Sequence, residues 1–334
     1  MNFQRLWIIF PIPRTIKELV KGMMFLALPF IFKHFKAYRN WKQARVFSGD
    51  KDKIRNSLYW KNLIRGFYEV PVFPESESMI TDINSMKLAI VIHCYYIDVF
   101  EEILIYLKRS DYQCFKLYVT HPFEWEEKIT ELLVKSGFEY YTRAVENKGR
   151  DVLPFLKITP EILKEKCDVV LKLHTKKSNY LKKKQLWSQV LFNELIGEGR
   201  IQKNMEILNT YSCIGILAPA GNIVPLSLYY GSNGEKLIYL AAKTGLEKEY
   251  LKDMVFVAGT MFYARREILD YLMNLALNDR DFDPEDSQID GTLAHVVERA
   301  VTLGLIDTRL QLADSDSKPD KISCRVILNH PYVI

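Results

Sequence analysis

The sequence has few cysteines and no apolar run long enough to cross a membrane. Its five cysteines include no Cys-x-x-Cys pair, and their odd number favours free buried thiols in a reducing compartment. Residues 22–32 form an uncharged apolar run of eleven residues, whereas a spanning helix needs roughly 20. The run also lacks a small-residue cleavage site, which argues against a signal peptide.

Several common catalytic motifs are absent as well. The sequence contains no Gly-x-x-x-x-Gly-Lys-Ser/Thr loop, no Gly-x-Gly-x-x-Gly turn, no His-Glu-x-x-His helix and no Gly-x-Ser-x-Gly elbow. These absences argue against a P-loop NTPase, a dinucleotide-dependent dehydrogenase, a zinc protease and a serine hydrolase. The composition, with 48% hydrophobic and 26% charged residues over 334 positions, is nevertheless that of a folded globular protein.

Positive charge is concentrated at the N-terminus. Residues 1–47 carry nine Lys or Arg and one acidic residue, so a whole-chain charge of +5 leaves about −3 for the remainder. This distribution argues against nucleic acid binding by the main domain. Cations mixed with apolar residues are typical of a helix lying in an anionic membrane surface, so we expect residues 1–47 to be a basic amphipathic membrane-associating segment. The alternative is a helix that packs on the main domain and exposes its cations.

The rest of the chain divides into two parts. Residues 48–86 are polar and contain Pro71 and Pro74, so we expect a helical or linker region there. From residue 87 onward short apolar runs alternate with segments of helical spacing, which indicates an α/β fold over 87–334: a Rossmann-like, mostly parallel sheet with helices on both faces. The expected strands are 87–94, 115–119, 140–145, 168–173, 214–218 and 255–264, and a late helix is expected over 289–303.

Polar clusters follow the first, third and fourth of these strands. Ligands of such sheets bind at the carboxyl ends of the strands, so these clusters are candidate ligand-binding groups. A tyrosine can stack on a base, a carboxylate can hold a ribose, and basic side chains can neutralise a diphosphate; the alternatives are helix caps, packing and a solvated basic loop. The candidate residues are Tyr95, Asp98, Asn147, Gly149, Arg150, Asp151, Lys172, His174, Thr175 and Lys176.

Two further clusters lie later in the chain. Small residues in the run 256–264 would let a ligand approach the backbone, and aromatic side chains could line a sugar pocket, the alternative being core packing. Carboxylates before the late helix are placed either to act as a general base or only to cap that helix. The candidate pocket residues are Gly259, Thr260, Phe262, Trp187 and His295, and the candidate bases are Asp290, Glu285 and Asp286.

Five motifs, taken in order, resemble those of the rhamnan synthesis protein F family. They occupy residues 90–98, 146–156, 170–178, 257–269 and 288–299, and the resemblance spans about 87–304. Members of this family are implicated in assembling rhamnose-containing and related cell-surface polysaccharides, and the order of motifs also resembles GT-A glycosyltransferases. The resemblance implies that Tyr95, Asp98 and the cluster 147–151 bind a nucleotide-sugar donor. It also implies that Asp290 supplies the base.

One position departs from the GT-A pattern. Where those enzymes carry Asp-x-Asp, this sequence reads His174-Thr175-Lys176. A divalent metal such as Mg or Mn usually needs carboxylate oxygens; His174 could ligate one, but protonated Lys176 could not. We therefore expect basic side chains, including Lys172 and Arg150, to steady the departing diphosphate in place of a metal.

The resemblance implies a glycosyltransferase, with inversion at the anomeric carbon. The expected donor is dTDP-rhamnose, and the expected acceptor is a lipid-linked oligosaccharide of a cell-surface polysaccharide such as O-antigen, capsule or rhamnan. The expected location is the cytoplasmic face of the bacterial inner membrane, as a peripheral protein alongside other polysaccharide-assembly enzymes. The alternatives are another donor such as UDP-galactofuranose, and a non-catalytic scaffold of an assembly complex.

Overall fold

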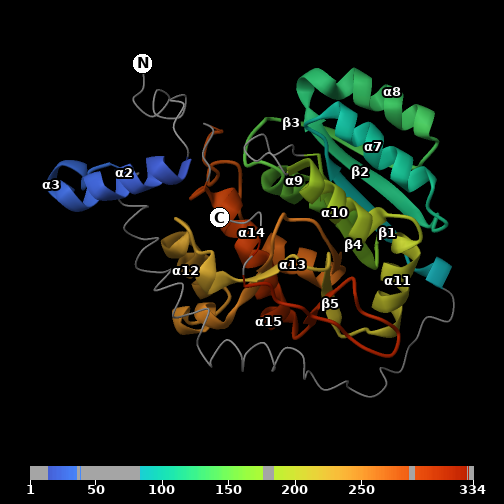
Figure 1. Cartoon of the computed structure of the whole chain (residues 1–334). Helices are drawn as coiled ribbons and strands as arrows, with labels where there is room; N and C mark the ends of the chain where they lie inside the picture. The colour runs from blue at the N-terminus through green and yellow to red at the C-terminus, as the bar shows by residue number, and fades with distance from the viewer. Residues whose placement is uncertain are drawn as a thin grey trace.

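A seven-stranded sheet forms the centre of the computed structural model, which describes residues 14–35, 38, 83–175, 184–285, 290–328 and 330 (Figure 1). The strand order is β3-β2-β1-β4-β8-β5-β9, and β6 pairs with β7 in a separate two-stranded sheet. The strands are β1 (Leu88–His93), β2 (Phe115–Pro122), β3 (Tyr140–Val145), β4 (Val169–His174), β5 (Ile214–Ala218), β6 (Ile223–Pro225), β7 (Val255–Val257), β8 (Phe262–Arg265) and β9 (Gln311–Asp314).

Most neighbouring strands of the large sheet are parallel. β8 is the exception, because it runs antiparallel to both β4 and β5, while the pairs β3-β2, β2-β1, β1-β4 and β5-β9 are parallel. The expected α/β class with a mostly parallel sheet is confirmed.

Helices cover both faces of the sheet (Figure 1). Leu88, Ile90 and Ile92 of β1 belong to the core beneath α7, α8, α10 and α11, whereas Ala89 and Val91 belong to the core beneath α9, α13 and α14. This alternation follows from the two-residue period of a strand buried on both faces. The helices are α2 (Arg14–Ala27), α3 (Pro29–Phe32), α7 (Ile97–Lys108), α8 (Glu126–Ser136), α9 (Val152–Lys164), α10 (Lys184–Ile196), α11 (Arg200–Thr210), α12 (Gly234–Lys243), α13 (Arg266–Asn274), α14 (Leu293–Ala300) and α15 (Gly304–Thr308), and the short 3₁₀ turns are η1 (Ile83–Ser85), η2 (Phe123–Trp125), η3 (Leu226–Leu228), η4 (Lys248–Asp253) and η5 (Val301–Leu303).

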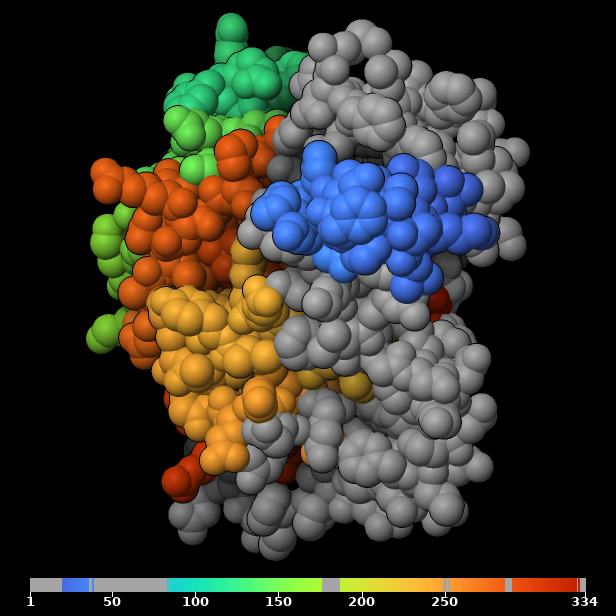
Figure 2. Space-filling view, turned by 90° about the vertical axis from the view of Figure 1, so that its left-hand side faces the viewer, coloured from blue at the N-terminus to red at the C-terminus, as the bar shows by residue number. Residues whose placement is uncertain are grey.

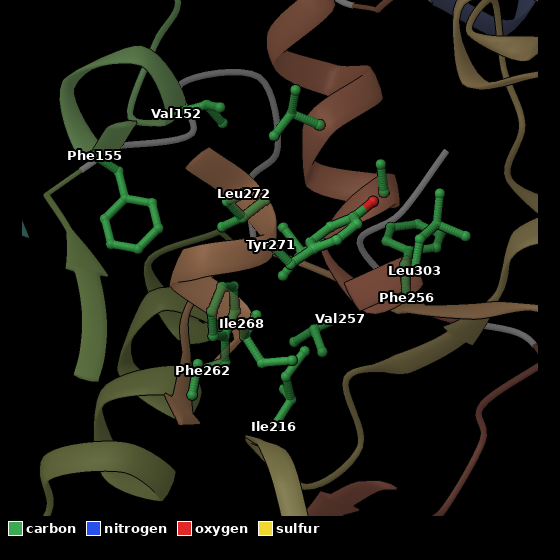
Figure 3. Close-up of a cluster of buried hydrophobic side chains, with 14 of the residues drawn as sticks. Val152, Phe155, Ile216, Phe256, Val257, Phe262, Ile268, Tyr271, Leu272 and Leu303 are labelled. Atoms are coloured by element: carbon green, nitrogen blue, oxygen red, sulfur yellow. The ribbon is translucent and has the colours of Figure 1, made fainter. Parts of the chain in front are cut away.

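Figure 3 shows part of the core between the sheet and α13. Ile216 of β5 and Phe262 of β8 lie beside Ile268 of α13, and all three side chains are buried. Burying one such side chain contributes about 1.5–3 kcal/mol to stability. Phe262 is therefore a core residue, and its expected place in a sugar pocket is corrected here.

The strand expected over 255–264 is interrupted. β7 ends at Val257, β8 begins at Phe262, and the residues between them form a turn. Gly259 and Thr260 in this turn both adopt positive φ, +91° and +56°, which the extended backbone of a strand does not allow. The late helix is also shorter than expected, because α14 covers Leu293–Ala300 and η5 continues the chain to Leu303.

Only part of the N-terminal region can be described. α2 and α3 are joined at Leu28 and lie beside the main body (Figure 1), while most of residues 36–82 fall outside the described ranges. No helix within the described part of the chain is both long and apolar enough to cross a bilayer.

Candidate functional site

Thr175 joins the carboxyl ends of β1 and β4. Its hydroxyl oxygen accepts hydrogen bonds from the backbone N–H groups of Tyr95 and Tyr96, each at 2.8 Å, and its own N–H donates to the carbonyl of His93. The Thr175 side chain is fully buried. It therefore fixes the loop after β1 within the protein, which corrects the expectation that Thr175 itself contacts a ligand.

That loop presents an aromatic side chain to solvent. Tyr95 is 39% exposed, and its ring meets Tyr96 edge-on at 5.0 Å between centroids. Asp98 is exposed in the first turn of α7, where a carboxylate is favoured by the helix dipole. An exposed ring held by a rigid loop is suited to stacking against a flat ligand.

The loop after β3 packs against a segment more than a hundred residues later. The Lys148 ammonium donates to the carbonyl of Asp279 (2.6 Å), and the backbone N–H of Arg150 donates to the Glu285 carboxylate (3.0 Å). Gly149 allows this approach, because a Cβ there would collide with Phe282 and Leu153. The structure thus brings two of the expected clusters together. Asn147 at this loop is exposed.

A buried ion pair lies beneath this loop. Lys172 Nζ is 2.5 Å from Asp151 Oδ2 and also donates to the carbonyl of Thr260 at 2.9 Å. The Lys172 side chain is only 2% exposed and its ammonium lies over the ring of Phe155. Lys172 thus holds the protein together here, and its expected contact with a diphosphate is corrected. Asp151 occupies the N-cap position of α9 without capping it, since its carboxylate faces Lys172 instead.

The turn between β7 and β8 is held from three sides. Nε2–H of His174 donates to the Gly259 carbonyl (2.8 Å), and the Gly259 N–H donates to the Glu298 carboxylate (3.1 Å). Lys172 binds the next carbonyl, that of Thr260. A β-branched residue with φ of +56° is strained, and such strain persists only where the surroundings enforce it. The side chains of His174, Glu298 and Lys172 hold the backbone of this turn in its strained conformation.

An aromatic and amide cluster borders the same turn. A Cβ on Gly259 would lie 3.2 Å from the Trp187 ring, so the indole lies directly against the backbone there. The Trp187 N–H and Nε2–H of His330 both donate to the Asn222 amide oxygen, at 2.9 and 3.1 Å. Burial lowers the pKa of His330 to about 4, so the ring is neutral at pH 7.

Asp290 is held by several donors. Its carboxylate accepts hydrogen bonds from the backbone N–H of Ser232 and the side-chain amide of Asn233, both at 2.8 Å, and lies 3.5 Å from the Arg299 guanidinium. Burial alone would raise the pKa of Asp290, but Arg299 and these donors outweigh it, and the pKa lies below its usual value. A Cβ on Gly231 would overlap Asp290 Oδ2, so only glycine fits at that position. Asp290 is therefore ionised and fixed in position.

Three of the expected site residues lie outside the contacts described above. His295 forms a capping box with Thr292 at the start of α14, so its expected place in a ligand pocket is corrected to a local structural role. Lys176 and Asp286 lie outside the described residues.

A divalent metal does not fit the groups that can be seen. Across the described ranges, no three His, Cys, Asp or Glu side chains gather as metal ligands. His174, which could have ligated a metal, uses Nε2–H to bind the Gly259 carbonyl.

Comparison with known proteins places this arrangement in a family. The sequence model described as rhamnan synthesis protein F matches residues 50–309. The chain belongs to the rhamnan synthesis protein F family. The description of this family associates its members with rhamnan synthesis.

The individual proteins that resemble this rhamnan synthesis protein F family member share only a minority of its residues. The protein WxcX from two strains of Xanthomonas campestris pv. campestris is 30% identical over 269 residues, which is 80% of this chain and 37% of WxcX. The chain therefore spans little more than a third of the curated relatives it matches. Among solved structures, 4-diphosphocytidyl-2C-methyl-D-erythritol synthase from Anaerococcus prevotii is 12% identical, with a TM-score of 0.39, and the match covers 73% of this chain and 93% of that one.

Some residues of the site in this rhamnan synthesis protein F family member were not expected from the sequence. Asn222 follows the carboxyl end of β5, and its place after a strand is the signal that could have identified it. His330 carries no such signal, because it lies 108 residues after its partner Asn222. Asn233 likewise has no motif around it and is recognised only through its contact with Asp290.

Proposed function

We propose that this chain is a glycosyltransferase that moves a sugar, most simply rhamnose from dTDP-rhamnose, to a lipid-linked oligosaccharide of a cell-surface polysaccharide. The observation that carries the proposal is the convergence of polar groups at one edge of the sheet. Thr175 ties the ends of β1 and β4 together, Glu285 ties the segment before α14 to the loop after β3, and Lys172 ties that loop's Asp151 to the turn before β8. Family membership in rhamnan synthesis supports the substrate class.

The donor would lie across this edge. Tyr95 is exposed and offers a ring for the nucleotide base, and Asn147 is exposed in the loop after β3, at the same edge of the sheet. The guanidinium of Arg150 and the basic residues after β4, Lys176 among them, would balance the charge of the diphosphate. The nearby Trp187 indole and the backbone of Gly259 would bound the sugar.

In the proposed reaction the acceptor hydroxyl oxygen attacks the anomeric carbon from the face opposite the diphosphate. The new carbon–oxygen bond forms as the bond to the diphosphate breaks, the hydroxyl proton passes to the Asp290 carboxylate, and the nucleoside diphosphate leaves. The configuration at the anomeric carbon is inverted. Asp290 suits this role because it is ionised and fixed, although its lowered pKa makes it a weaker base than a free carboxylate. We place the reaction at the cytoplasmic face of the bacterial inner membrane.

Thermal unfolding with a panel of nucleotide sugars tests the donor assignment. A donor that binds only the folded state stabilises it by mass action, by about 2.7 kcal/mol at a hundred times its Kd. We expect dTDP-rhamnose to raise the melting temperature more than UDP-galactofuranose, and slow hydrolysis of the donor to release the nucleoside diphosphate. Stabilisation without any hydrolysis or transfer would identify a binding or scaffold protein instead.

The role of Asp290 is tested by Asp290→Asn. Loss of the base should lower kcat by roughly 10²–10⁴-fold. Asn233→Ala is the matched control, because it removes one donor to the same carboxylate while leaving the base in place. We expect Asn233→Ala to retain most of the activity. Equal losses in both variants, with folding checked by circular dichroism, would show that Asp290 only positions its neighbours.

A further inference from the structure

Exposed apolar side chains are concentrated on α2, α3 and the turn after them. Half of the large hydrophobic residues that are exposed in the described part of the chain lie between positions 20 and 35. Leu26 is 62% exposed, Phe30 is 65% exposed and Phe35 is 57% exposed. Figure 2 shows α2 and α3 on the outside of the molecule, on the face turned toward the viewer. Soluble surfaces rarely gather so much apolar area in one place without a partner.

The two helices have a small packed centre of their own. Phe25 is only 6% exposed and its ring meets Phe32 at 5.2 Å and Tyr38 at 5.4 Å between centroids. Aromatic rings in contact at these distances attract each other beyond the burial of their surface. Phe25 therefore turns inward and links α2 to the chain beyond α3, while its neighbours Met24 and Leu26 stay at the surface.

The charge of this region selects the kind of partner. Residues 1–47 carry a net +8, whereas the rest of the chain carries about −3. Lys21 on α2 and Lys33 after α3 lie among the exposed apolar residues of this segment. Exposed apolar side chains combined with positive charge favour a partner that has an apolar interior and a negatively charged surface. An anionic phospholipid layer has both.

The length of the helices sets how they would meet such a layer. α2 has 14 residues, which at 1.5 Å per residue gives about 21 Å, short of the roughly 30 Å of a bilayer core. The kink at Leu28 and Pro29 shortens any straight stretch further. The pair is therefore built to lie in the surface and not to cross it.

We propose that α2 and α3 form a docking surface for anionic phospholipid, inserting Leu26, Phe30 and Phe35 below the headgroups while Lys21 and Lys33 contact phosphate. This inference is independent of the proposed sugar transfer, because it concerns a different part of the molecule and needs no substrate. It assigns the apolar face a lipid partner in preference to a second copy of the chain or another segment of the same chain.

Co-sedimentation of the full-length protein with vesicles tests this proposal. We expect binding to phosphatidylcholine vesicles that contain phosphatidylglycerol and little binding to phosphatidylcholine alone. Each basic residue at an anionic surface is worth about 1 kcal/mol, or about fivefold, so Lys21→Gln with Lys33→Gln should weaken partitioning about 30-fold at low salt. Leu26→Ser with Phe30→Ser should weaken it at least about tenfold.

A matched pair controls for general loss of surface hydrophobicity. Ile105 and Val134 are 51% and 65% exposed on α7 and α8, and Ile105→Ser with Val134→Ser should leave partitioning unchanged. Equal losses in the two serine pairs, or no binding of the unaltered protein to anionic vesicles, would overturn the proposal. So would unchanged partitioning of Leu26→Ser with Phe30→Ser accompanied by dissociation of a dimer or by a lower melting temperature, because the face would then be covered by protein.

Discussion

At the scale of single residues, Lys172 shows how the site is supported from below. A lysine in the middle of a buried strand is tolerated because Asp151 neutralises it and the Thr260 carbonyl accepts a second hydrogen bond. The ammonium thereby joins α9, β4 and the turn before β8. The same burial makes the pair vulnerable, since removing one partner leaves the other charged without compensation.

Lys172→Met is therefore expected to lower the free energy of unfolding by about 3–5 kcal/mol, measured by urea denaturation. Lys135→Met is the control, because Lys135 pairs with Glu131 on the surface, where solvent screens the charges, and its loss should leave the free energy of unfolding nearly unchanged. The double change Lys172→Met with Asp151→Leu should recover part of the loss. If Lys172→Met were as stable as Lys135→Met, the buried Asp151 carboxylate would not need Lys172 to neutralise it.

His93 gives the fold a dependence on pH. Burial lowers its pKa from 6.5 to about 3, so the folded protein leaves the ring neutral at pH 5 while the unfolded chain binds a proton. Because the unfolded state binds more protons below pH 6.5, stability falls as the pH falls, by roughly 2 kcal/mol for this group between pH 7 and 5. His93→Gln should show a smaller loss over that interval in denaturant titrations at the two pH values. An unchanged difference would assign the pH dependence to other groups.

At the scale of elements, two glycines with similar backbone angles differ in what surrounds them. Gly137 ends α8 with φ of +75° and nothing within 4 Å of an added Cβ, whereas Gly149 has φ of +67° and would collide with Phe282 and Leu153. Gly137→Ala should cost about 1–2 kcal/mol, from the left-handed backbone alone. Gly149→Ala should cost about 1–3 kcal/mol more, because the loop after β3 must move from the segment before α14. Equal changes in melting temperature would show that this packing is loose.

The regular elements could largely be predicted from the sequence. The third strand was expected over 140–145, and the structure has it as β3, Tyr140–Val145. Short apolar runs and helical spacing are local signals, so local pattern is sufficient to find them. The expected strand over 255–264 was wrong between Val257 and Phe262, where the chain forms a turn. The sequence Gly259-Thr260 does not by itself distinguish a glycine inside a strand from a glycine that ends one.

The site itself was only partly predictable. The positions after β1, β3 and β4 were expected to lie together because the carboxyl ends of parallel strands share an edge. The structure shows that these strands are parallel and end at one edge of the sheet. Which atoms meet was not predictable, because a partner 80 residues away decides whether a polar side chain faces a ligand or the protein. Thr175 and Lys172 both turned out to bind the protein's own backbone.

At the scale of the whole molecule, the C-terminal segment from residue 326 onward packs beside the two-stranded sheet of β6 and β7. The N–H of Ile327 donates to the Ile223 carbonyl (2.8 Å), and the N–H of His330 donates to the Tyr229 hydroxyl (3.0 Å). Through Asn222 this segment also supports Trp187. A distant part of the chain thus braces one wall of the candidate site.

Deleting residues 326–334 should therefore lower the melting temperature by at least about 4 °C, since each kcal/mol lost shifts it by roughly 2–4 °C in a domain of this size class. Removing only residues 331–334 keeps the contacts of Ile327 and His330 and should change it less. Differential scanning calorimetry of both truncations measures the difference. Identical melting temperatures would show that the segment contributes nothing to the fold.

The reversed direction of β8 constrains where this protein can change length. Lys172 pairs with Phe262 and Val170 with Ala264, so the turn that precedes β8 is brought beside the end of β4 by a fixed count of residues. An insertion of one residue between the turn and Phe262 would break that count and would part Lys172 and His174 from the carbonyls they bind. Insertions and deletions in related sequences should therefore accumulate in the loops and helices between β5 and β7. The number of residues between Gly259 and β8 should stay constant.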